Sequence, residues 1–400
     1  MNQNRIEIKH VTGEDLLETS FPLRGYAFAP SPRKTDLDAW RRALPSQQEH
    51  HTLVLFADGA PRATATSIAM TQAVRGRVLS MGGVAGVATH PLGRRQGYAW
   101  QVLVRLLQDM RDQGHAVSSL GPFRESFYGR LGWAGFPAPR VIQFAPVTLQ
   151  PLLRWDLPGE TTLHDDEAGL TALRAFLTRV QPAVHGMSLR GPTAAAGQFD
   201  HEMRWIVLAR DGEEVVGAMT YSISDWRGQL DVDAFFAETA AGSYLLLRWL
   251  ALHADQVTRI TLTLPPDVMP ELWVTDLNAE VHSRDVDNHP NPMGRIVDIT
   301  RIDGIGAGDG RFSVHIEDEY APWNTGTYTF HGKGGCLRVE AADPKRATGA
   351  ISMAGLSALI FNGTDPDTFA YRGWGNIDRP TREVMRAVFP PAWPYLHEDF

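Results

Sequence analysis

The sequence predicts a mixed α/β (α+β) protein made of three domains. Its 400 residues exceed what one hydrophobic core usually contains. A hairpin, a strand, a helix and a further strand follow one another twice before residue 283, which indicates an internal duplication. Strands alternate with a helix in the rest of the chain. We therefore expect domains over residues 1–150, 151–283 and 284–400.

The first block begins with a predicted hairpin, His51–Ala57 with Arg62–Met70. An apolar run, Val84–Thr89, then leads through a turn into a helix that ends at Gly114. The apolar residues of that helix fall on one face: Trp100, Val102, Leu103, Leu106, Leu107 and Met110. A final strand over Val141–Pro146 closes the block.

The second block has a helix, a hairpin, a strand, a helix and a strand, predicted over Asp166–Val180, Trp205–Ala209 with Val215–Ser222, Leu230–Phe236, Ser243–Asp255 and Arg259–Leu264. The proline-containing segment His282–Gly294 has the composition of a linker. The third block has three strands and a helix, predicted over Phe312–Glu317, Gly326–His331, Cys336–Ala341 and Met353–Asn362.

Composition excludes several functions. The net charge of −8 disfavours a general nucleic-acid binder, which needs clustered Lys and Arg. The single cysteine, Cys336, permits neither an intramolecular disulfide nor a cysteine zinc site, and no HExxH spacing occurs, so no metal is expected. Neither a secretory signal nor a membrane-spanning run is visible, so we expect a cytoplasmic protein without a membrane partner.

The turn Arg94-Arg95-Gln96-Gly97-Tyr98-Ala99 lies at the N-terminus of the first long helix. Free N–H groups and the positive end of the helix dipole make such a turn a site for an anionic pyrophosphate. Gly97 lets the phosphate approach the backbone, and the small Ala99 does not crowd it. There is no Walker lysine and no GxGxxG, so nucleotide triphosphates and dinucleotides are poor candidates.

Glycines interrupt the strand before this turn, at Gly82-Gly83 and Gly86. They predict a β-bulge or a close backbone approach by a ligand, although an ordinary core strand would also accept them. A bulged strand splayed from its neighbour leaves N–H and C=O groups that can pair with an extended pantetheine arm. In the second block the turn is replaced by Glu238–Ser243, which has no basic residue, so we expect this copy not to bind the cofactor.

Taken together, these residues resemble the GCN5-related N-acetyltransferases, in which Arg/Gln-x-x-Gly-x-Gly/Ala holds the pyrophosphate of coenzyme A. The downstream segments look like a signature of the enhanced intracellular survival family, with Trp133 in place of its common Tyr: Ser119-Leu120-Gly121-Pro122-Phe123, Phe127-Tyr128 and Gly132-Trp133. That family joins an acetyltransferase domain, a degenerate second copy and a domain resembling sterol carrier protein. The third block is similar to the last of these at Ile316-Glu317-Asp318, Asn324-Thr325-Gly326 and Leu356–Gly363.

The resemblance implies acetyl-CoA as co-substrate. Its pantetheine would lie on the backbone of Val87, Ala88 and Thr89, and its pyrophosphate on Arg95, Gln96, Gly97, Tyr98, Ala99 and Trp100, with Phe123 also in contact. The resemblance makes Tyr128 the proton donor to the leaving thiolate and the α-carboxylate of Phe400 the general base. An unperturbed tyrosine pKa of about 10 would suit the first role. A merely packed tyrosine and a frayed chain end are the alternatives, although the aromatic tail Trp393–Phe400 favours docking.

The implied function is N-acetylation of small-molecule amines by direct transfer in a ternary complex. By resemblance the substrates are aminoglycosides, the consequence is antibiotic resistance, and the assembly is a homohexamer. The acidic balance of the chain fits cationic acceptors, with Glu398 and Asp399 as candidate contacts. A protein-lysine acetyltransferase, or a lipid-binding or scaffold protein with a vestigial transferase domain, are the alternatives.

Overall fold

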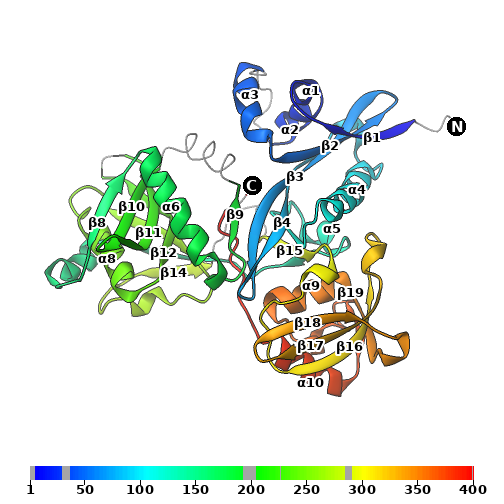
Figure 1. Cartoon of the computed structure of the whole chain (residues 1–400). Helices are drawn as coiled ribbons and strands as arrows, with labels where there is room; N and C mark the ends of the chain where they lie inside the picture. Colours follow the sequence, from blue (N-terminus) through cyan, green and yellow to red (C-terminus); the bar gives the residue numbers. More distant parts are fainter. Residues whose placement is uncertain (1–4, 29–36, 192–203, 226, 284–290, 399) are drawn as a thin grey trace.

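The computed structural model describes residues 5–28, 37–191, 204–225, 227–283, 291–398 and 400. They form three β-sheets with helices packed against them, which confirms the predicted mixed α/β class (Figure 1). Across these ranges no helix is both long and apolar enough to cross a membrane.

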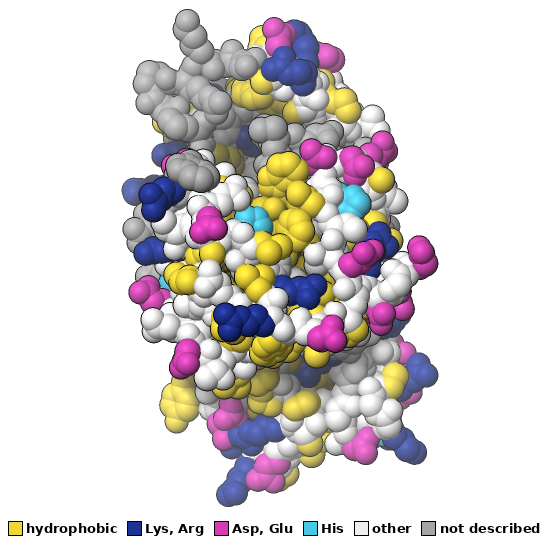
Figure 2. All heavy atoms as spheres, turned by 90° about the vertical axis from the view of Figure 1, so that its left-hand side faces the viewer, with side chains coloured by type: hydrophobic (Ala, Val, Ile, Leu, Met, Phe, Trp, Pro, Cys, Tyr) yellow, Lys and Arg dark blue, Asp and Glu magenta, His cyan; other side chains and the backbone are white. Residues whose placement is uncertain are grey.

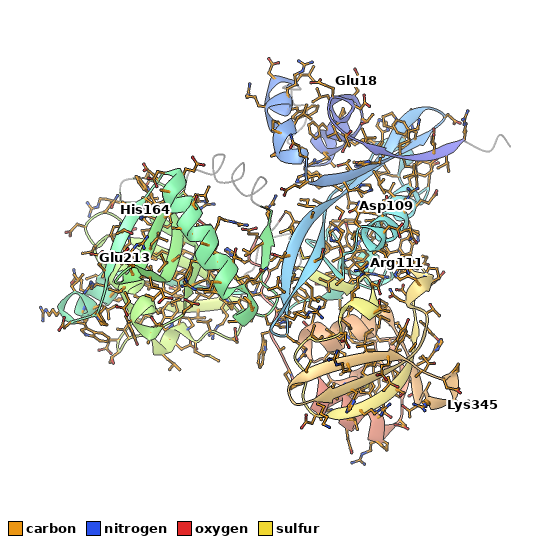
Figure 3. The ribbon with its side chains drawn as sticks, viewed as in Figure 1. Glu18, Asp109, Arg111, His164, Glu213 and Lys345 are labelled. Atoms are coloured by element: carbon orange, nitrogen blue, oxygen red, sulfur yellow. The ribbon has the colours of Figure 1, made fainter. Side chains whose placement is uncertain are left out.

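The first sheet has the strand order β1-β2-β3-β4-β5-β15-β6, with β9 paired to β3. Its strands are β1 Ile6–Val11, β2 His50–Ala57, β3 Ala60–Val74, β4 Arg77–Thr89, β5 Val117–Leu120, β6 Ala134–Gly135, β9 Ser188–Arg190 and β15 Met293–Ile296. Its helices are α1 Asp15–Glu18, α2 Ser20–Phe28, α3 Leu37–Ala43, α4 Tyr98–Asp112 and α5 Glu125–Gly129. The apolar face of α4 packs on one side of the sheet, as predicted, and Asp109 and Arg111 project from its last turn (Figure 3).

The second sheet has the order β14-β7-β13-β12-β11-β10-β8. Its strands are β7 Arg140–Phe144, β8 Glu160–His164, β10 Trp205–Asp211, β11 Glu214–Ile223, β12 Gln229–Ala237, β13 Arg259–Leu264 and β14 Glu280–Ser283. Helices α6 Glu167–Val180 and α8 Ala240–Ala251 pack against it. Helix α8 begins and ends earlier than the helix predicted over Ser243–Asp255. It begins earlier because the side chain of Thr239 caps its N-terminus.

The two sheets exchange strands. Strand β7, which we assigned from sequence to the first block, pairs with β13 and β14 of the second sheet. Strand β15 includes the end of the predicted linker His282–Gly294 and pairs with β5 and β6 of the first sheet. The middle of that segment, residues 284–290, lies outside the described residues. An apolar run reveals a buried strand but not the sheet that buries it, so the sequence could not show this exchange.

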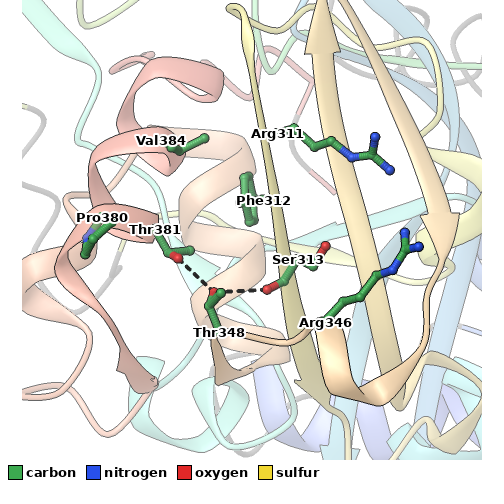
Figure 4. A pocket seen from close by; sticks show the side chains of 8 residues that line it. All are labelled: Arg311, Phe312, Ser313, Arg346, Thr348, Pro380, Thr381 and Val384. Atoms are coloured by element: carbon green, nitrogen blue, oxygen red, sulfur yellow. Dashed lines mark hydrogen bonds between the residues drawn. The ribbon is translucent and has the colours of Figure 1, made fainter.

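The third sheet has the order β18-β17-β16-β19-β20, with strands β16 Gly310–Glu317, β17 Gly326–Lys333, β18 Cys336–Ala341, β19 Gly349–Ser352 and β20 Gly375–Ile377. Helices α9 Met353–Asn362 and α10 Arg379–Val388 pack on it, and the core of this domain continues into the first sheet. A cavity of about 460 Å³ opens beside β16 and α10 (Figure 4). There Thr381 Oγ1 donates to Thr348 Oγ1 at 2.8 Å, and Arg311 and Arg346 lie at the rim.

The three domains meet at the turn between β3 and β4. The Arg75 guanidinium donates to the carbonyls of Ile360 on α9 and of Pro390 after α10, at 2.5 and 2.9 Å. The backbone N–H of Arg75 donates to His185 Nδ1 at 3.0 Å, so His185 Nε2 carries the proton and donates to the carbonyl of Phe361 at 2.6 Å. Burial lowers the pKa of His185 to about 4, which keeps the ring neutral.

Candidate active site

The open end of the first sheet lies between β4 and β5. The two parallel strands pair from Met81–Val117 to Val84–Leu120, where β5 ends and β4 continues to Thr89. On its other edge β4 pairs with β3, and there Gly86 and Val87 both face Ala65. This two-to-one register is the predicted β-bulge, with Gly86 at φ +59°. Within the described chain, the edge of Val87–Thr89 that faces β5 has no strand partner, as a pantetheine arm requires.

The turn before α4 presents an uncapped helix N-terminus. Gly97 is the N-cap residue with φ +76°, and no side chain caps the helix there. A Cβ at Gly97 would meet no heavy atom within 4 Å, so the space beside this backbone is open. Arg95 also has a positive φ of 61°, and both Arg95 and Gln96 are exposed. These features fit a bound pyrophosphate.

Two predicted cofactor-binding side chains face elsewhere. Tyr98 is buried in the core, and its hydroxyl donates to Gln96 Oε1 at 2.8 Å, so the ring supports the turn from below. The ring of Trp100 packs edge-on against Phe127 and Tyr320, at centroid distances of 5.7 and 4.7 Å. A ligand at the N-terminus of α4 would therefore contact the backbone at Tyr98, Ala99 and Trp100. The side chains of Tyr98 and Trp100 point away from the helix axis into other contacts.

Tyr128 lies on α5 and is almost fully buried. The rings of Phe123, Phe127 and Trp133 surround it edge-on, at centroid distances of 5.4, 5.1 and 6.1 Å. Burial raises the pKa of the Tyr128 phenol above its ordinary value, so the near match with a thiol expected from sequence does not hold. The phenol stays protonated and is able to donate a hydrogen bond or a proton. Phe123, by contrast, is 61% exposed and covers the Tyr128 ring from the surface.

The turn after Tyr128 is held by residues from far along the chain. Arg295 of β15 is fully buried, and it donates to the carbonyl of Leu131 and to Asp318 Oδ2, the latter at 2.6 Å. Its guanidinium also lies over the ring of Trp133, 5.4 Å from the centroid. The position of Tyr128 therefore depends on residues of the first and third blocks of the chain.

The C-terminal tail is docked, as the aromatic residues predicted, and is not frayed. The chain rises from the third domain and ends between the other two, beside β9 (Figure 1). The Tyr395 N–H donates to the carbonyl of His185 at 2.8 Å, and Ser188 Oγ donates to the carbonyl of Glu398 at 2.9 Å.

The Glu398 carboxylate accepts from Arg174 at 2.5 Å and from the Arg190 N–H. Glu398 is therefore already paired, and Asp399 lies outside the described residues.

The ring of Phe400 rests on the strand that carries the bulge. Its Cε2 and Cζ atoms lie 3.0 Å from the position that a Cβ on Gly83 would occupy. A Cβ on Gly82 would instead meet Met110 of α4. Side chains of the protein, and not a ligand, therefore make the close approach predicted at Gly82-Gly83. Met110 approaches from one face of the sheet and Phe400 from the other.

The structure thus brings two distant candidates to one place. Gly83, beneath Phe400, is followed by Val84, which belongs to the same buried cluster as Tyr128 and Leu120. Successive strand residues point to opposite faces, so Phe400 packs on the face of β4 opposite to the one that carries the cluster of Val84 and Tyr128.

Two residues near this site were missed from sequence. Arg24 on α2 lies against Gly86, and His50 at the start of β2 lies in the same row across the sheet as Gly83, through Ile68. No local motif marks either residue, because only the folded sheet brings them to β4. The neighbouring His51 forms a hydrogen bond with Asp109 at 2.7 Å and has a structural role.

In the described part of the chain, no group of three or more His, Cys, Asp and Glu could hold a metal ion.

Comparisons with known proteins agree with this geometry. Residues 7–136 and 167–296 each match a family described as an acetyltransferase (GNAT) domain, and residues 304–397 match the sterol carrier protein domain. An uncharacterized N-acetyltransferase of Streptomyces avermitilis is 25% identical over 309 residues, which span 69% of this chain and 72% of the relative.

Solved structures share the fold over the whole chain. A GCN5-related N-acetyltransferase from Kribbella flavida superposes with a TM-score of 0.83 at 20% identity, covering 99% of both chains. One from Anabaena variabilis gives 0.84 at 16% identity, covering 99% of this chain and 100% of the other. Eis1 from Mycobacterium abscessus gives 0.77 at 19%, with the same coverage.

The fold and the domain matches define a tandem GNAT protein with a C-terminal sterol-carrier-like domain, as predicted. The chain is an N-acetyltransferase that uses acetyl-CoA.

Proposed function

We propose that this enzyme acetylates small-molecule primary amines in a single active site, formed by the first domain and the C-terminal tail. The observation that supports the proposal most is the packing of the Phe400 ring on Gly83. The next residue of β4, Val84, belongs to the buried cluster that contains Tyr128. The second acetyltransferase-like domain then serves as a scaffold that supplies β9 and Arg174 to hold the tail.

The proposed reaction is direct transfer in a ternary complex. The neutral acceptor amine attacks the thioester carbonyl, a C–N bond forms and the C–S bond breaks. The α-carboxylate of Phe400 takes the proton from the amine, directly or through a water molecule, and Tyr128 gives a proton to the leaving thiolate. The products are the acetamide and free coenzyme A. The raised pKa of Tyr128 keeps the phenol protonated when it enters the reaction, although it also makes the phenol a weaker acid towards the departing thiolate.

Acetyl-CoA fits the residues present. The bulged edge at Val87–Thr89 offers free peptide groups to pantetheine, and the uncapped N-terminus of α4 at Gly97 offers N–H groups to the pyrophosphate. Arg95 and Gln96 are exposed beside it. The intact site argues against a vestigial transferase.

The resemblance to the enhanced intracellular survival family makes aminoglycosides the first acceptors to test, with antibiotic resistance as the expected consequence. Lysine side chains of proteins are the second class. A panel of both, assayed by thiol release from acetyl-CoA, tests the proposal. Acetylation of at least one class supports it, whereas no acetylated amine in a panel that also includes simple polyamines would refute it.

We also propose that the chain assembles as a homo-oligomer, a hexamer by resemblance. Apolar side chains gather in the middle of the face that the second domain presents (Figure 2). Exposed large apolar residues of this domain include Leu153, Trp155, Leu163, Leu252 and Leu272. Light scattering after size-exclusion chromatography tests the proposal, and a monomer at micromolar concentration would contradict it.

A further inference from the structure

Arg24 brings an uncompensated positive charge to the bulge of β4. Its Nε and Cδ atoms lie 3.0 and 3.2 Å from the position that a Cβ on Gly86 would occupy. The guanidinium therefore stands beside the edge along which the acetylated end of the pantetheine would run. The side chain is half-buried, and its guanidinium carbon lies over the ring of Phe21 on the same helix, 5.6 Å from the centroid.

Among the described residues, no carboxylate forms an ion pair with Arg24, the chain terminus included, and no hydrogen-bond acceptor is found for it. Burial lowers the pKa of Arg24 from its ordinary value, which shows that the surroundings penalise the charge. An arginine nevertheless remains protonated in proteins. A half-buried cation without a counter-ion is costly, and an anionic ligand would remove that cost.

In the described part of the chain, none of the neighbouring groups on this face pairs with Arg24, the carboxylates of Glu49 and Phe400 included. His50 accepts no proton at neutral pH, because burial and then the charges of Arg24 and Arg190 lower its pKa to about 4. Its Nδ1 bonds Gln47 Oε1 at 2.8 Å, so Nδ1 carries the proton. His50 Nε2 is therefore an acceptor, and it is buried without a hydrogen-bond partner. The Glu398 carboxylate of the tail is engaged by Arg174 and by the Arg190 N–H.

We propose that Arg24 binds an anionic group, a carboxylate or a phosphate, on the acceptor whose amine is acetylated, and that His50 Nε2 accepts a hydrogen bond from the same molecule. The inference rests on the proposed amine acetyltransferase activity. It refines the acceptor class: amines that also bear an anionic group are preferred to their neutral or purely cationic counterparts.

The test uses acceptor pairs that differ only in the anionic group. L-lysine against L-lysinamide probes a carboxylate, and glucosamine 6-phosphate against glucosamine probes a phosphate. In the wild type we expect kcat/KM for the anionic member of at least one pair to exceed that of its partner about tenfold, the value of one charged hydrogen bond. Arg24→Gln should abolish this preference by lowering kcat/KM for the anionic member far more than for its neutral partner, and Arg24→Lys should keep part of it. Arg42→Gln, at an exposed site on α3, is the matched control.

Equal kcat/KM within both pairs would overturn the proposal, as would an equal loss for both members of a pair in Arg24→Gln. If the wild type acetylates no amine at all, the proposed function fails. Calorimetry then tests anion binding at Arg24 without relying on turnover. Nε-acetyl-lysine should bind to the wild type in the presence of coenzyme A more tightly than its amide, and Arg24→Gln should remove the difference. Equal or absent binding of the two compounds would reject the subsite.

Discussion

The first and second acetyltransferase-like domains share a fold but differ where a coenzyme would bind. Each has a parallel strand pair that separates, β4 from β5 after Val84 and β12 from β13 after Val232. Each has a helix that begins after the longer strand. In the first domain that helix is uncapped at Gly97, whereas in the second the Thr239 hydroxyl accepts the N–H of Gly242 at 3.0 Å.

The gap between the strands differs as well. In the second domain the ring of Phe235 on β12 is buried and stacks on Trp273 at a centroid distance of 5.5 Å. Glu238, beside the helix N-terminus, pairs with Arg179. In the second domain a capping hydroxyl, an acid and an apolar cover thus occupy the places that are open in the first domain, and we expect no coenzyme to bind there. The comparison teaches that the fold alone does not make a coenzyme site, since the free N–H groups do.

The largest effect should come from the phenol of the first domain. Tyr128→Phe removes the only proposed proton donor, and we expect kcat to fall by about a thousandfold with little change in KM for acetyl-CoA. Tyr221→Phe, at a buried tyrosine of the second domain, is the control and should leave kcat unchanged. Steady-state thiol release measures both. If the two variants have equal kcat, Tyr128 is only a packed side chain.

The tail should matter next. Deletion of Phe400, or extension of the chain beyond it, moves or removes the terminal carboxylate, and kcat should fall about a hundredfold. An N-terminal extension of the same length is the control. Full activity of a C-terminally extended enzyme would show that the carboxylate is not the base.

The phosphate turn should show a smaller effect on binding. Gly97→Ala places a Cβ at φ +76°, which strains the turn and shifts the helix N-terminus, and we expect KM for acetyl-CoA to rise about tenfold. Gly59→Ala introduces the same strain at φ +79° in the β2–β3 turn, with equal open space. It should lower stability by a similar amount and leave KM unchanged. Equal KM values in the two variants would remove Gly97 from the site.

Acid should loosen the first domain and its attachments before the core of the second. Burial lowers the pKa of His50, His115, His185 and His397 to about 4. Below about pH 6.5 the unfolded chain takes up protons at these positions and the folded chain does not, so stability falls as the pH drops from 6.5 towards 4. Hydrogen exchange at pH 7 and pH 5 should show faster opening in β2–β5 and the tail than in β10–β13. Uniform acceleration across both domains would contradict this order.

The smallest effect is on stability alone. Thr239→Ala removes the cap of α8 and should cost about 1 kcal/mol of the free energy of unfolding. Turnover should not change, because we expect the second domain to bind no coenzyme. Urea denaturation and thiol release check the two statements, and a lower kcat in a folded variant would assign that helix a part in catalysis.

Much of the fold could be predicted from sequence because its signals are local. The apolar face of α4, the glycines of β4 and the turn at Gly97 each have a period or a residue type that specifies local structure. The duplication was visible as a repeated order of elements. The exchange of β7 and β15 was not, since strand partners depend on tertiary contacts that a single sequence does not show.

The candidate site was predictable to a lesser degree. Gly97, Tyr128 and Phe400 came from a motif or a family resemblance, and the structure brings the last two to one end of β4. The support of Tyr128 by Arg295 and the approach of Arg24 to Gly86 had no sequence signal, because each joins residues more than 60 positions apart. The expectation that Glu398 would meet a cationic acceptor overlooked Arg174, which already pairs with it.

The central claim is that one active site exists per chain and that it lies in the first domain. Isothermal titration of the enzyme with acetyl-CoA tests this most directly. We expect a stoichiometry of one per chain, weakened by Gly97→Ala and unchanged by Thr239→Ala. A stoichiometry of two, or binding that Gly97→Ala leaves intact, would contradict the account.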